Sequence, residues 1–291
     1  MIVSARPYPD CRGISSKNEF FGTDEMNFYP LGRDALLSGL IALGLKKGNS
    51  VIVPAFMCRS TIQPLQAYGF KLVFIDIGKG LELPVDIIKQ VAAKDDSIKA
   101  ILVVHYFGLT QNIDEIVDVC REYGVKVVED ASHSFMSQLL RDRDSIKGDI
   151  EIFSMRKSLP VVDGGALRVN NDNFRPIKTC NSRCVSIVGD IKYLTLRFFE
   201  RLVTGLGVNI YGQFINSIKV KLRSKIIHEV HEYSAETCQV SWQLKKYLGS
   251  EKYLQSTQHK ITNNFNQLSQ ALQGFGFRLF CESIEDSTIP Q

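Results

Sequence analysis

The residues of this chain best suited to chemistry are a lysine, a carboxylate and a histidine that follow predicted buried strands. Lys157 lies in the loop that follows a predicted strand ending at Phe153 and Ser154. Desolvation in such a loop lowers the pKa of an amine and yields the unprotonated nucleophile that Schiff-base chemistry needs. Asp130 and His133 follow the apolar run at 125–128. A buried carboxylate there fits either a partner for a cationic ligand nitrogen or a capping Asp beside a core histidine.

A third segment, at residues 31–44, could bind an anion. Gly32 precedes a predicted helix with Asp34 as its cap. Backbone N–H groups and the helix dipole favour a phosphate at such an N-terminus. A glycine and a cap also begin many helices that bind nothing, so this segment alone favours the structural interpretation.

The elements that must position these residues alternate between 33 and 169 and predict a parallel α/β sheet. Helices are expected at 34–43, 60–68 and 113–124, and strands at 51–55, 71–77, 100–108 and 125–132. Polar residues at strand ends place His105, Asp130 and His133 at the carboxyl edge, where open α/β folds bind ligands. For His105 a structural, hydrogen-bonded strand-end histidine is the favoured interpretation.

Composition excludes several classes of protein. The 291 residues include 35 Lys and Arg against 31 Asp and Glu, a net charge of +4 without a dense basic block, so nucleic acid is not an expected partner. Seven cysteines without a CxxC pair argue against a disulfide scaffold or a zinc ribbon, and no metal site is expected. The absence of a signal or spanning segment predicts a cytoplasmic protein. A nicotinamide oxidoreductase would need a GxGxxG turn, which is missing.

The three segments, in this order and at these distances, resemble the pyridoxal-phosphate (PLP) sugar-nucleotide aminotransferases of the DegT/DnrJ/StrS type over roughly the first 170 residues. Members carry an SGT-A-L helix start, a VIVPS strand, an EDAAQ strand end, and a strand-Ser-loop-Lys followed by GDGG. The corresponding stretches here are LGRDAL, VIVPA, EDASH and FSMRKSLPVVDGG. The resemblance implies the type I PLP-dependent transferase fold, with three layers and a mostly parallel sheet flanked by helices.

The resemblance also implies roles for individual residues. Lys157 would bond to the cofactor and move a proton during transfer, and its presence argues against the dehydratase branch, in which a histidine replaces it. Asp130 would pair with the pyridine nitrogen. His133, in place of a frequent glutamine, would lie near the ring's 3′-oxygen. The cofactor phosphate would be bound by Ser154 and the backbone of Gly32, Arg33 and Asp34.

Two features depart from the family pattern. Cys58 stands where many relatives carry an aromatic residue that stacks on the pyridine ring. Either this thiol or Phe56 would then contact that face of the cofactor, or Cys58 is a small buried core residue. In relatives a partner subunit supplies an Asn or Arg to the phosphate, but the nearest segment, 231–242, contains neither, so no partner residue is assigned.

The chain is divided into three expected regions. Residues 1–185 form the large PLP-binding α/β domain, 186–230 a basic amphipathic helical insertion, and 231–291 an incomplete small C-terminal domain. Segment 187–227 fits either a helical insertion packed on the domain or at a dimer interface, which is favoured, or a membrane-surface helix. No stable membrane anchoring is expected, only weak surface contact through this segment.

These inferences predict a cytoplasmic, homodimeric PLP-dependent aminotransferase. It would transfer an amino group, with glutamate as the donor, to a nucleotide-linked keto-sugar in surface polysaccharide or glycoconjugate biosynthesis. The alternative is a degenerate or truncated PLP-fold protein that binds the cofactor or a partner without turnover.

Overall fold

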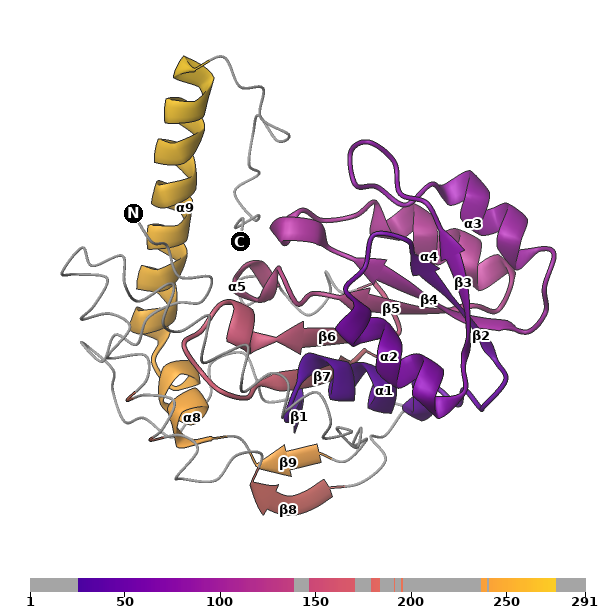
Figure 1. The fold of residues 1–291 in the computed structure, drawn as a ribbon, viewed down its shortest axis with the longest axis horizontal. Coiled ribbons are helices and arrows are strands. Elements are labelled where there is room, and N and C mark those ends of the chain that lie inside the picture. The colour runs from indigo at the N-terminus through magenta and orange to yellow at the C-terminus, as the bar shows by residue number, and fades with distance from the viewer. Residues whose placement is uncertain are drawn as a thin grey trace, which may run out of the picture.

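A computed structural model describes residues 26–138, 147–170, 179–183, 191, 195, 237–239 and 241–275. Its centre is a seven-stranded sheet of order β1-β7-β6-β5-β4-β2-β3 (Figure 1). The strands are β1 (Met26–Tyr29), β2 (Ser50–Pro54), β3 (Lys71–Ile75), β4 (Ile98–Val104), β5 (Lys126–Asp130), β6 (Ile150–Ser154) and β7 (Gly165–Val169). Strands β3, β2, β4, β5 and β6 are parallel, whereas β7 is antiparallel to both β6 and β1. The predicted mostly parallel sheet is confirmed.

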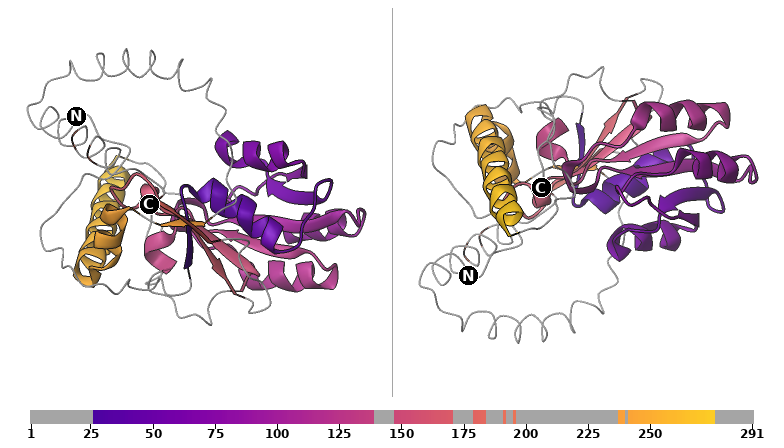
Figure 2. Two further views of the ribbon diagram at one scale, coloured as in Figure 1. Left: turned by 90° about the horizontal axis from the view of Figure 1, so that it is seen from below. Right: turned by 90° about the horizontal axis from the view of Figure 1, so that it is seen from above.

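Helices cover both faces of this sheet, as Figure 2 shows from two sides. Helices α1 (Gly32–Ala42) and α2 (Arg59–Tyr68) pack on one face, and α3 (Val85–Ala92) and α4 (Ile113–Glu122) pack on the other. Burial on both faces explains the continuous apolar run of β2, in which Val51 and Val53 face α1 and α2 while Ile52 faces α3 and α4. The three-layer architecture is therefore confirmed. None of the helices in the described part of the chain is long and apolar enough to cross a membrane.

Helix α1 begins differently from the prediction. Asp34 is not its cap, because the helix already starts at Gly32 and follows Leu31, which offers no capping side chain. Packing fixes this start: a Cβ on Gly165 would lie 2.2 Å from the carbonyl of Leu31, so only glycine lets β7 approach the helix so closely. The predicted end of α2 is confirmed, since Gly69 follows Tyr68 in the left-handed conformation (φ 105°).

A network of buried hydrogen bonds links the carboxyl ends of β4 and β5. The backbone N–H of Gln111 donates to Nδ1 of His105 (3.2 Å), so Nε2 carries the ring proton and donates to Glu129 (2.9 Å). Gly148 N–H donates to the other carboxylate oxygen of Glu129 (2.6 Å). Burial alone would raise the pKa of Glu129, but these hydrogen bonds bring it below its usual value. His105 is structural, as expected.

Helices near the end of the described chain pack against the carboxyl end of β6. A small parallel pair, β8 (Thr179–Arg183) and β9 (Thr237–Gln239), precedes α8 (Trp242–Leu248) and α9 (Glu251–Gly274). Leu244 and Leu254 pack with Phe153 and Met155 in one buried cluster. The division into three regions remains a prediction, because 186–230, apart from Ile191 and Thr195, lies outside the described residues.

Ser241 links α8 to the loop that follows Lys157. Its N–H and its hydroxyl donate to the two carboxylate oxygens of Asp163, each at 2.7 Å, and the hydroxyl also accepts from the N–H of Leu244 at 3.2 Å. The Ser241→Ala variant is expected to lose about 1–3 kcal/mol of unfolding free energy, because it removes a charged hydrogen bond and a helix cap. Urea denaturation measures this loss. The exposed Ser256→Ala is the control, and equal stability of the two variants would contradict the assignment.

Candidate active site

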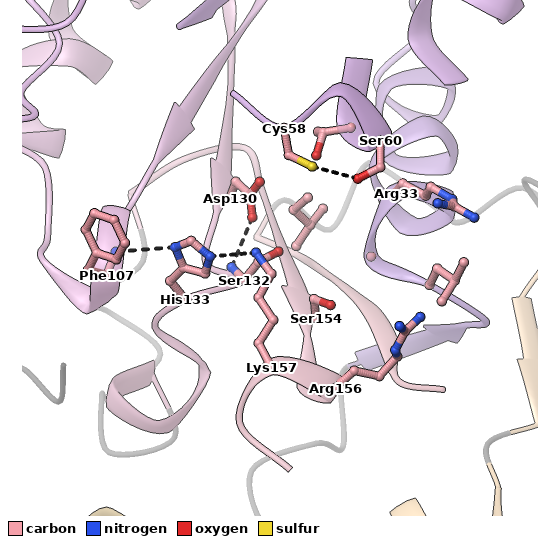
Figure 3. Close-up of a pocket in the computed structure, with 14 residues that line it drawn as sticks. Arg33, Cys58, Ser60, Phe107, Asp130, Ser132, His133, Ser154, Arg156 and Lys157 are labelled. Atoms are coloured by element: carbon pink, nitrogen blue, oxygen red, sulfur yellow. Dashed lines mark hydrogen bonds between the residues drawn. The ribbon is translucent and has the colours of Figure 1, made fainter. Parts of the chain in front are cut away.

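One pocket of about 510 Å³ lies at the carboxyl ends of β5 and β6, beside the N-terminus of α1 (Figure 3). Seven of the eight predicted site residues line it: Gly32, Arg33, Cys58, Asp130, His133, Ser154 and Lys157. Asp34 is the exception; it is buried in the first turn of α1 and is not among the lining residues. The sheet therefore brings together three segments that are far apart in sequence.

Lys157 is positioned by a short helical turn, η3 (Met155–Lys157), directly after β6. Met155 is fully buried and anchors this turn, while the lysine side chain enters the pocket. Its Nζ lies 2.7 Å from Nε2 of His133. Although the side chain is open to the pocket, the protein around it desolvates the amine and lowers the pKa of Lys157, against the opposing effects of Asp130 and Cys58. Such an amine is a better nucleophile at neutral pH than a solvated lysine.

Asp130 supplies the negative charge of the site. It is the last residue of β5, is 8% exposed, and accepts a hydrogen bond from the N–H of Ser132 at 3.0 Å. Burial, together with this nearby carboxylate, raises the pKa of Tyr106 to about 12. The phenol stays protonated and donates to the carbonyl of Phe56 at 2.6 Å. The carboxylate thus sits at a strand end, where it can pair with a cationic group of a ligand.

The N-terminus of α1 forms the other end of the pocket. A Cβ on Gly32 would lie 3.0 Å from the carbonyl oxygen of Phe153 and 3.1 Å from Cβ of Ser154, so glycine brings the helix start against the end of β6. The helix dipole and the guanidinium groups of Arg33 and Arg156, which also line the pocket, favour an anion here. In Figure 3 these arginines lie on the other side of the pocket from His133.

Cys58 corrects one of the sequence interpretations. The thiol is exposed rather than buried in the core, and its Sγ lies 2.9 Å from Oγ of Ser60. That hydrogen bond is the main cause of a pKa below the usual value for a thiol. Phe56 is 55% exposed and packs on Tyr106 with ring centroids 5.5 Å apart, without lining the pocket.

Several lining residues were missed by the sequence analysis. Phe107 is the most informative, since its ring stacks on His133 at 5.7 Å and 15°. Its position beside His105 at the end of a predicted strand was the available signal. The others are neighbours of the residues that were predicted, the polar Ser60, Thr61, Ser132 and Arg156 and the apolar Leu31 and Ile152.

Comparison with known proteins gives one family match. The model of the DegT/DnrJ/EryC1/StrS aminotransferase family matches residues 19–198. A GDP-perosamine synthase of Vibrio cholerae is 29% identical over 144 residues, which cover 48% of this chain and 39% of the relative. A UDP-2-acetamido-2-deoxy-3-oxo-D-glucuronate aminotransferase of Pseudomonas aeruginosa is 32% identical over 147 residues, with 49% and 40% covered. The chain spans about two-fifths of the length of these relatives.

Solved structures give similar partial matches. The structure of NtdA from Bacillus subtilis with bound cofactor PMP is 28% identical, with a TM-score of 0.45, and the match covers 51% of this chain and 34% of that one. The E. coli GDP-4-keto-6-deoxy-D-mannose-3-dehydratase with bound hydrated PLP is 30% identical, also with a TM-score of 0.45, over 52% and 41% of the two chains.

Proposed function

Because the chain belongs to the DegT/DnrJ/EryC1/StrS aminotransferase family, we propose that it is a PLP-dependent aminotransferase that passes an amino group from glutamate to a nucleotide-linked keto-sugar. The observation that carries the proposal is the convergence of Lys157, Asp130 and the α1 N-terminus on one pocket. Relatives named for sugar-nucleotide amination support the substrate class. A cytoplasmic homodimer that serves surface polysaccharide or glycoconjugate synthesis is part of the same proposal, on the family resemblance alone.

The residues present fit the three functional groups of PLP. The aldehyde calls for an unprotonated amine, and the pKa of Lys157 is lowered. The pyridine nitrogen calls for a carboxylate, which Asp130 offers from the same edge of the sheet. The phosphate calls for a helix N-terminus without bulk, which Gly32 provides against Ser154. The pocket volume of about 510 Å³ is within the range of small-molecule sites.

Each residue then has a defined task. When bound, PLP supplies an electron sink for the bonds at the amino-acid Cα. Asp130 would hold a proton on the pyridine nitrogen, and Gly32 and Ser154 would fix the phosphate. Nζ of Lys157 would bind the cofactor and later take and return a proton as a general base. Arg33 and Arg156 add positive charge that favours acidic substrates.

An amination assay tests this function directly. The purified chain is incubated with PLP, glutamate and GDP-4-keto-6-deoxymannose, the compound after which one structurally similar dehydratase is named. We expect formation of 2-oxoglutarate and of an aminated sugar nucleotide, both detected by mass spectrometry, with Lys157→Ala as the blank. If PLP binds but neither product forms with this or other nucleotide-linked keto-sugars, the non-catalytic alternative replaces the proposal.

A glycine substitution tests the phosphate end of the pocket. In Gly32→Ala the added Cβ would press on Phe153 and Ser154 at 3.0–3.1 Å and displace the helix start. We expect the Kd for PLP to rise about tenfold, which corresponds to about 1.4 kcal/mol. Absorption or fluorescence titration measures it. Gly274→Ala is the matched control, because a Cβ there meets nothing within 4 Å. An unchanged Kd in a folded Gly32→Ala protein would argue against this phosphate site.

A further inference from the structure

The hydrogen bonds of His133 determine which ring nitrogen carries its proton. The backbone N–H of Phe107 points at Nδ1 over 3.3 Å, so Nδ1 must accept. Burial lowers the pKa of His133, which favours the neutral ring. In a neutral ring whose Nδ1 accepts, the proton resides on Nε2.

This tautomer restricts the state of the lysine. Nε2–H of His133 faces Nζ of Lys157 at 2.7 Å, as the dashed lines of Figure 3 show. An ammonium group has three donors and no acceptor, whereas a free amine has a lone pair. We propose that His133 is a positioning residue that donates from Nε2 to Lys157 and holds it as the free amine, with the backbone of Phe107 fixing the tautomer. The use of that amine toward a carbonyl cofactor rests on the proposed function.

The backbone of Phe107 supports this arrangement independently. Its φ of 54° and ψ of 22° lie in the left-handed region, which a bulky residue rarely adopts. Such a conformation persists only when the surroundings determine it, and it occurs most often at functional sites. Here it directs the N–H at His133, while the half-exposed ring stacks on the imidazole at 15°. The strained residue therefore fixes both the tautomer and the plane of His133.

The other charges around Lys157 act in both directions. Asp130, at the end of β5, and Cys58, the residue before α2, both raise the pKa of Lys157. Arg33 of α1 and Arg156 of η3 line the same pocket and add positive charge. The two acidic groups therefore attract an ammonium, whereas desolvation, the two arginines and the donor at Nε2 favour the neutral amine.

Two measurements on the cofactor-free chain test the proposal. The first is ¹⁵N NMR of histidine-labelled protein, which separates the two neutral tautomers. We expect His133 to be protonated at Nε2. A proton on Nδ1 would overturn the proposal, and this readout needs no variant.

The second measurement is the pH profile of Lys157 acetylation, read by peptide mass spectrometry with the exposed Lys252 as internal reference. In His133→Ala we expect Lys157 to react about tenfold more slowly near neutral pH, because loss of one hydrogen bond favours the ammonium. His133→Gln should keep the wild-type profile, since its amide can still donate. A wild-type profile in His133→Ala, or an Ala-like profile in His133→Gln, would overturn the proposal.

Failure of this inference is distinguishable from failure of the proposed function. A chain that shows the Nε2 proton and the reactive Lys157 but binds no PLP would contradict the function alone. A chain that binds PLP through Lys157 and carries the His133 proton on Nδ1 would contradict the inference alone.

Discussion

Replacing Lys157 with alanine is expected to lower the turnover of amino transfer by about 10³-fold or more. Under the proposed function the variant would lose both the nucleophile for the cofactor and the base for proton transfer, and among the residues that line the pocket no other lysine can replace it. PLP should still bind noncovalently, because Asp130 and the α1 N-terminus remain. Steady-state rates and a PLP titration on the same sample separate the two effects.

The control for this variant is Lys252→Ala, which removes an exposed lysine of α9 and should retain the wild-type rate. Lys157→Arg adds a second comparison, because arginine keeps a long basic side chain but stays protonated and cannot act as a nucleophile. Full amino transfer by either Lys157 variant would refute the assigned role.

Replacing Asp130 with asparagine is expected to reduce turnover by about 10²–10³-fold with little loss of stability. In the wild-type chain the N–H of Ser132 donates to Oδ1 of Asp130 at 3.0 Å. An amide oxygen can still accept this hydrogen bond, so the strand end should keep its shape. A neutral amide, however, cannot hold a proton on a pyridine nitrogen, so the cofactor would accept electrons less readily. Turnover and the thermal midpoint are measured together.

The matched control is Asp118→Asn, which alters an exposed carboxylate paired with Arg121 on α4. It should change neither the rate nor the stability by a measurable amount. If Asp130→Asn lowers the thermal midpoint well below that of Asp118→Asn, the carboxylate has a structural role. If it leaves the rate at the wild-type level, the assigned pairing with the pyridine nitrogen is wrong.

The sequence predicted the parts of the molecule that depend on local pattern. Apolar runs such as 51–53 and 100–104 are buried on both faces and were read correctly as strands. Lys157 and Asp130 could be located because each lies at or just after the end of such a strand. Gly69 could be located because a left-handed residue that ends a helix is almost always glycine.

Features that depend on tertiary contacts could not be predicted. The start of α1 is set by the contact of Gly165 with Leu31 rather than by an Asp34 cap. The exposure of Cys58 depends on how the turn before α2 faces the pocket. The stacking of Phe107 on His133 requires a positive φ at a bulky residue, which no propensity favours. The link from Asp163 to Ser241 joins positions 78 residues apart.

Reductive trapping tests whether Lys157 is the residue that bonds to PLP. The chain is mixed with PLP, reduced with borohydride and digested, and the modified peptide is identified by mass spectrometry. We expect a stoichiometric phosphopyridoxyl group on Lys157. Incubation with glutamate before the reduction should prevent this labelling. A label spread over exposed lysines such as Lys252, or no label at position 157, would contradict it.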